Sequence, residues 1–68
     1  MNNDYLVSAV NDSIQKIKNM DSESEVPNKD DFKANADFLS TMIEHPEVKK
    51  LIDVSACQKA IKLAEDNL

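Results

Sequence analysis

The sequence predicts an all-α fold, a three-helix module. Glycine is absent from its 68 residues, and Pro27 and Pro46 are its two prolines. A β-rich domain of this size would need several tight turns, which glycine normally supplies. Apolar side chains also recur at helical spacing in three separate segments. We therefore expect one helical domain over residues 1–68.

The first predicted helix covers about residues 4–19. Leu6, Val10, Ile14 and Ile17 follow one another at intervals of four, four and three residues. This spacing places them in one stripe along a helix. The letters NND at positions 2–4 offer side-chain oxygens that can cap its first free N–H groups.

Residues 20–30 are expected to form an acidic loop. Pro27 disfavours the helical conformation at Val26, and the serine, asparagine and aspartate side chains nearby compete for backbone hydrogen bonds. Residues 21–31 contain five carboxylates and one lysine, so they carry a charge of -4, whereas the whole chain carries -5. The rest of the chain is nearly neutral and has no basic patch, so we expect no binding to nucleic acid.

The second predicted helix covers residues 31–45, and Asp30 or Asp31 caps its start. It has a wider apolar face than the first helix, which suggests neighbours on two sides. Its two rows are Phe32, Ala36, Leu39 and Ile43, and beside them Phe38 and Met42.

Pro46 marks a sharp corner, because proline disfavours helix at His45 and is tolerated in the first turn of the next helix. A third helix is then predicted over residues 47–66. Its first half carries Val48, Leu51 and Ile52 on one side. Together with Leu39, Leu51 is expected to be a core residue.

The later apolar residues of this third segment point elsewhere. At 100° per residue, Cys57, Ala60, Ile61 and Ala64 lie well around the helix from Val48. The helix either continues and presents a second face to another chain, or it breaks near Ser55, where Ser55 and Gln58 have the spacing of a capping box. Nothing nearby forbids a helix, so we expect a continuous one.

No catalytic, metal or cofactor site is predicted. Cys57 and His45 are the only soft ligands, too few for a tetrahedral zinc site, and a single cysteine excludes a disulfide within the chain. A phosphate-binding loop requires glycine. We expect His45 to have a capping or exposed role and Cys57 to be a small buried apolar residue. The sequence therefore indicates no enzyme.

The sequence also lacks an apolar run long enough to span a membrane and a signal peptide. With one cysteine, a reducing cytoplasmic setting is expected. A core of this size supplies roughly 3–5 kcal/mol, so small domains usually need a disulfide, a metal or a partner. A partner chain is therefore the expected source of further stability.

The segments "VNDSIQKI" and "DFLSTMIEHPEVKKLIDV" with the following helix resemble the L-twenty-seven domain, the heterodimerisation module of membrane-associated guanylate-kinase and cell-polarity scaffold proteins. The resemblance covers about residues 6–63 and consists of apolar spacing and one proline. It implies that two different domains pair, with their first two helices forming a four-helix bundle and their third helices a further interface. It also implies a location at the membrane periphery through partners.

We therefore expect a protein–protein interaction module that pairs with another helical domain, or with copies of itself when alone. The residues predicted to bind the partner are Leu6, Val10, Ile14, Ile17, Leu39, Met42, Ile43, Leu51, Ile52, Ala60 and Ile61. The alternative is a small acidic helical inhibitor or regulator, of the kind phages and plasmids encode, which blocks a target through its acidic loop. Salt would weaken that second mode strongly.

Overall fold

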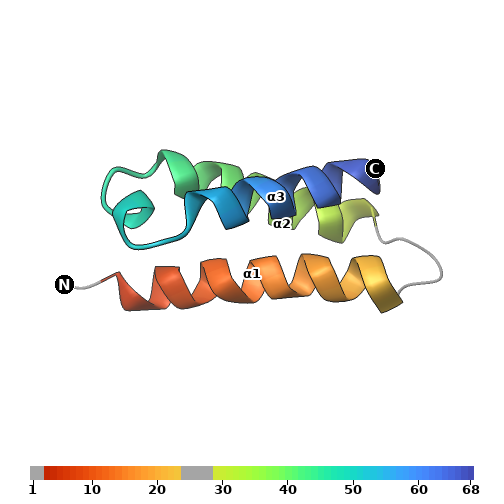
Figure 1. Ribbon diagram of the computed structural model, residues 1–68, viewed down its shortest axis with the longest axis horizontal. Helices are drawn as coiled ribbons and strands as arrows, with labels where there is room; N and C mark the ends of the chain where they lie inside the picture. Colours follow the sequence, from red (N-terminus) through yellow and green to blue (C-terminus); the bar gives the residue numbers. More distant parts are fainter. Residues whose placement is uncertain (1–2, 24–28) are drawn as a thin grey trace.

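The computed structural model describes residues 3–23 and 29–68, and it confirms the all-α fold. The helices are α1 (Asp4–Glu23), α2 (Lys29–Glu44) and α3 (Val54–Asp66), and the 3₁₀ turn η1 (Val48–Lys50) lies between α2 and α3. Helices α1 and α3 run in the same direction, and α2 runs antiparallel to both (Figure 1). The bundle is a rod of 40 × 17 × 17 Å.

The core lies along the line where the three helices meet, since each helix packs against both of the others. Four of its ten apolar residues are alanine or cysteine, and three of those four are on α3. Small side chains let neighbouring helices approach closely. The buried apolar residues are Val10, Ile17, Phe32, Ala36, Leu39, Met42, Val48, Cys57, Ala60 and Ala64.

Helix α1 is longer than predicted, because it ends at Glu23 and not near residue 19. Ser22 fits the helix by donating a hydrogen bond from its hydroxyl to the carbonyl of Asn19, at 3.3 Å. Asp21 accepts a hydrogen bond from the amide of Asn67, at 2.9 Å. This contact with the end of α3 is a tertiary one that local propensity does not include.

Helix α2 also begins earlier than predicted, at Lys29. Asp30 and Asp31 lie in its first turn, where the helix dipole favours negative charge. The expected acidic loop of residues 20–30 is therefore helical at both of its ends. Its centre, residues 24–28, lies outside the described residues.

The prediction of one continuous helix over residues 47–66 was wrong. The chain forms η1, turns, and starts α3 at Val54. Asp53, in an extended conformation with ψ 98°, caps α3 by accepting a hydrogen bond at Oδ1 from the backbone N–H of Ala56, at 3.0 Å. The cap thus lies two residues before Ser55, the position that the capping-box spacing indicated.

The break explains why the apolar residues of the third segment would lie on two sides of a straight helix. In a straight helix, Val48 and the later set of Cys57, Ala60 and Ala64 would point to different sides. The turn before Asp53 redirects the chain, so that all four residues are buried in one core. Ala60, expected at an interface with another chain, therefore belongs to the interior of its own bundle.

Leu51 was predicted to be a core residue, but 55% of its surface is exposed. It follows η1, where its backbone N–H donates to the carbonyl of Val48 at 2.8 Å. In that tight turn Val48 faces the core, and Leu51 does not.

Leu39→Ala should lower the free energy of unfolding by about 2–5 kcal/mol, because it removes a fully buried side chain and leaves a cavity. Leu51→Ala, the matched control, should cost less than about 1 kcal/mol, as expected for an exposed position. Urea denaturation followed by circular dichroism measures both. Equal losses would mean that Leu51 is a core residue.

Candidate partner-binding surface

The structure divides the residues predicted to bind a partner into three groups. Buried within the single chain are Val10, Ile17, Leu39, Met42 and Ala60. Partly buried and packed against that core are Leu6, Ile14, Ile43, Ile52 and Ile61. Leu51 alone of the predicted set is classed as exposed. The set therefore does not form one continuous surface on the folded chain.

The sequence pattern could not make this division. Helical spacing tells which side of each helix is apolar. It does not tell whether another helix of the same chain or a partner covers that side. Helix α3 packs against both α1 and α2 and covers much of their apolar sides.

Two of the three exposed large apolar residues in the described parts of the chain lie at one end of the rod. Tyr5 is 68% exposed and Leu51 is 55% exposed. Figure 1 places the start of α1 and η1 at the same end of the bundle. We call Tyr5 and Leu51, together with the partly buried Leu6 and Ile52, the corner patch. Leu68, also exposed, ends the chain at the other end of the rod.

Sequence reasoning missed Tyr5 because it lies outside the apolar stripe of α1, one residue and hence 100° from Leu6. The available signal was its aromatic character. An exposed tyrosine near a helix start has an apolar ring and a polar hydroxyl, a combination that is common where proteins bind each other.

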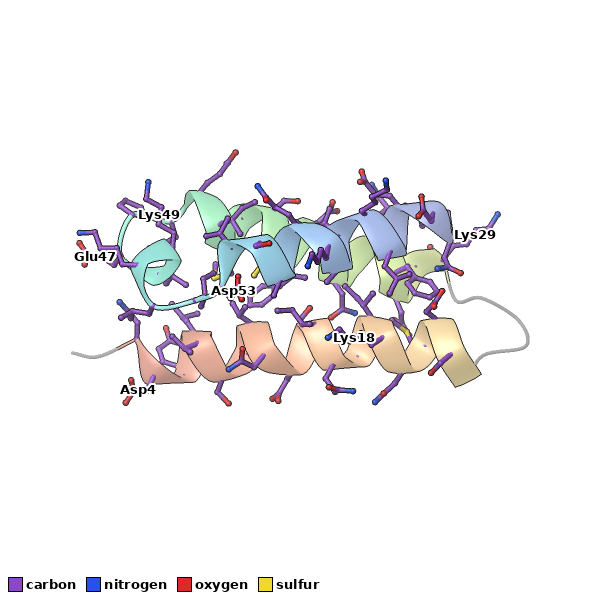
Figure 2. All side chains as sticks on the ribbon, in the orientation of Figure 1. Asp4, Lys18, Lys29, Glu47, Lys49 and Asp53 are labelled. Carbon is purple, nitrogen blue, oxygen red and sulfur yellow. The ribbon has the colours of Figure 1, made fainter. Side chains whose placement is uncertain are left out.

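Charged side chains of both signs lie toward the same end of the rod as the corner patch. Asp4, Glu47, Lys49, Lys50 and Asp53 are all exposed. Figure 2 shows Glu47 and Lys49 projecting outward at this end, with Asp4 near the start of α1. An apolar centre with a charged rim is the usual composition of a protein interface.

His45 holds the corner in shape. Its Nδ1 accepts hydrogen bonds from the backbone N–H groups of Glu47 and Val48, at 3.2 and 3.3 Å. Its own carbonyl accepts from the N–H of Lys49 at 3.0 Å. Of the two roles expected for His45, capping or exposure, these hydrogen bonds show capping, and they hold Val48 where its side chain enters the core.

Cys57 lies in the core, as predicted. Burial, and secondarily the negative charge of Asp53, raise the pKa of the Cys57 thiol above its usual value. A thiol that resists ionisation is a poor nucleophile, because the thiolate is the reactive form. Cys57 therefore acts as a small apolar side chain.

The described residues offer no cluster of side chains suited to a metal ion. They contain no group of three or more His, Cys, Asp or Glu side chains that could hold a metal ion. In the same ranges, 3–23 and 29–68, no helix has the length and apolar character needed to cross a lipid bilayer. The polar atoms of buried side chains there all have hydrogen-bond partners.

No family model, no curated protein and no solved structure matches this chain significantly. The resemblance to the L-twenty-seven domain therefore still rests on the apolar spacing and Pro46 alone.

His45→Ala should lower the free energy of unfolding by about 1 kcal/mol, the usual cost of losing a capping acceptor. His45→Asn should cost less, because its side-chain oxygen can also accept from backbone N–H groups. Urea denaturation of the two variants measures the difference. Equal losses would show that the imidazole acts through packing rather than through Nδ1.

Cys57 should react with a thiol reagent only when the chain unfolds, so added urea should accelerate the reaction.

The raised pKa of the Cys57 thiol also predicts that stability depends on pH. Above about pH 8.5 the unfolded thiol loses its proton while the folded thiol retains it, so stability falls as pH rises. Urea unfolding across this range should show a shallower fall for Cys57→Ala. An unchanged slope would contradict the assignment.

Proposed function

We propose that this chain is a protein–protein interaction module that assembles with another helical domain, as its resemblance to the L-twenty-seven domain implied. The observation that carries the proposal is the number of large apolar side chains that the closed bundle covers only in part. Eight such side chains among the described residues pack against the core and stay partly exposed. These are Leu6, Ile14, Met20, Phe38, Ile43, Ile52, Ile61 and Leu63.

The corner patch is the natural centre of such an interface, because Tyr5 and Leu51 are its most exposed apolar side chains. Burying one such side chain fully contributes about 1.5–3 kcal/mol. Association itself costs about 4–15 kcal/mol. The two exposed residues alone therefore support only weak binding.

A stable complex must cover more of the partly buried side chains as well. Those side chains come from all three helices and extend along the rod. A partner that lies along the bundle, such as a helix or helix pair, can reach many of them at once. This geometry favours a folded helical partner over a short peptide.

Two binding routes are compatible with such a partner. In the first, the partner docks on the closed bundle at the corner patch and the adjoining helices. In the second, α3 leaves and the partner forms a four-helix bundle with α1 and α2. The second route exposes Val10, Ile17 and Leu39, which are fully buried in the closed chain.

A cross-link between α1 and α3 separates the two routes. The side chains of Asp21 and Asn67 are already in hydrogen-bond contact at 2.9 Å. Cysteines introduced at these two positions, in a Cys57→Ala background, can be joined by a short bismaleimide. Docking on the closed bundle should survive the cross-link, whereas the four-helix route should be blocked.

The alternative, an acidic inhibitor, is favoured by one observation. The bond between Asp21 and Asn67 brings the ends of α1 and α3 together, so Glu65 and Asp66 lie at the same end of the rod as Asp30. A target with a basic surface would recognise this end. Its binding would weaken steeply with added salt, whereas apolar docking would not.

Replacing both exposed residues, Tyr5→Ser with Leu51→Ser, should weaken binding of a helical partner domain at least tenfold, which corresponds to about 1.4 kcal/mol. Sedimentation velocity should be run on the chain alone, over a concentration series, and then mixed with helical domains of the L-twenty-seven type.

The matched control is Ser8→Ala with Gln58→Ala, two exposed positions outside the corner patch, and it should leave binding unchanged. If the serine variant binds as tightly as the natural chain, the corner patch is not the interface. If exchanging Glu65 and Asp66 for Gln and Asn abolishes binding instead, the acidic-inhibitor hypothesis replaces the interaction-module hypothesis.

A further inference from the structure

Ser13 is the one buried polar residue among the described parts of the chain, with 5% of its surface exposed. It lies on α1 between Val10 and Ile17, which are both fully buried. An alanine or a larger aliphatic residue would be the ordinary choice at such a position.

The hydroxyl of Ser13 is bonded across the interface between α1 and α2. Its Oγ donates to Oδ1 of Asn35 at 2.7 Å. The Nδ2 of Asn35 in turn donates to the backbone carbonyl of Asp31, one turn earlier on α2, at 2.8 Å. The second bond orients the amide so that its oxygen faces α1.

This pair forms only when the two helices are antiparallel and residue 13 lies opposite residue 35. A shift of α1 by one turn would bring Val10 or Ile17 opposite Asn35. The partly buried carbonyl oxygen of Asn35 would then face apolar groups and lose its donor, and the hydroxyl of Ser13 would lose its partner on α2. A buried polar group without its hydrogen bond is costly.

The apolar residues around the pair discriminate between registers less strongly. Aliphatic side chains recur on α1 at nearly every turn, at Leu6, Val10, Ile14 and Ile17. Contacts between such rows are not directional, so a slipped pairing retains much of the apolar burial.

We propose that the Ser13–Asn35 pair is a register lock, which selects one arrangement of α1 on α2 at no net gain in stability. A single buried polar residue at a helix interface can specify register and association state at a cost in stability. The inference goes beyond partner binding, because it concerns how the chain chooses its own fold.

The test is the double variant Ser13→Ala with Asn35→Leu, which replaces both polar partners with apolar groups. The folding equilibrium constant should stay within about tenfold of the natural chain, or rise, because neither partner is left unsatisfied. Amide resonances in a ¹H–¹⁵N spectrum should multiply, and sedimentation equilibrium should show more self-association than the natural chain does at equal concentration.

The single variant Ser13→Ala should behave differently, because it leaves the Oδ1 of Asn35 without its donor. It should lower the folding equilibrium constant by about tenfold, because Asn35 is only partly buried and its orphaned oxygen therefore costs the lower part of the usual range. Its spectrum should retain one set of resonances, since Asn35 still disfavours the slipped registers.

The control variant, Ser8→Ala with Ser40→Leu, makes a comparable change in composition at two exposed positions on the same helices. It should match the natural chain in both measurements. A Ser13→Ala, Asn35→Leu variant with one set of resonances and unchanged association would overturn the proposal. So would loss of folding in that variant, since the pair would then be a source of stability.

Discussion

The change of direction between His45 and Asp53 is the constraint on which the rest of the structure depends. The third segment carries two sets of apolar residues that a straight helix would point to different sides. The Nδ1 of His45 supplies the acceptor for the N–H groups at the start of the corner. Asp53 supplies the acceptor at its end. With these two hydrogen-bond acceptors in place, the chain can turn between α2 and α3, so that α3 completes the core without a partner chain.

The corner also decides which side chains remain accessible. Val48 enters the core from η1, and Leu51 is left outside on the same short turn. Helix α3 then contributes mainly small residues to the interior, namely Cys57, Ala60 and Ala64. Close approach of α3 follows from their size. The larger residues Ile61 and Leu63 are displaced to its flanks, where they are partly covered.

The closed core and the partly covered apolar side chains around it together support the function we propose. A chain that buries one set of apolar residues fully and leaves eight large ones partly covered can fold alone and still gain from a partner. The proposed register lock acts in the same direction. The Ser13–Asn35 bond keeps α1 and α2 in one arrangement, so that the partly covered residues form a defined surface. A defined surface is what a specific partner requires, because binding then costs less reordering.

The sequence by itself determined the helical class, the apolar faces of α1 and α2, and the core position of Cys57. Each follows from local quantities: glycine content, residue spacing, the backbone limits set by Pro46, and the chemistry of single side chains. The spacing of apolar residues was sufficient to predict α1 and α2. It did not predict the end of α1, where Asp21 accepts a hydrogen bond from Asn67.

Only the tertiary structure decided which apolar residues are covered. Val10, Leu39 and Ala60 satisfy the same spacing rule whether a helix of this chain or of another packs on them. The choice depends on whether the third segment bends, and the bend at Asp53 gains its stability from burying Val48 and Cys57 together. That gain comes from packing Val48 and Cys57 against helices that lie earlier in the sequence, since η1 packs on α2 and α3 packs on both α1 and α2. No local pattern contains it, and for that reason Ala60 was expected outside the core and Leu51 within it.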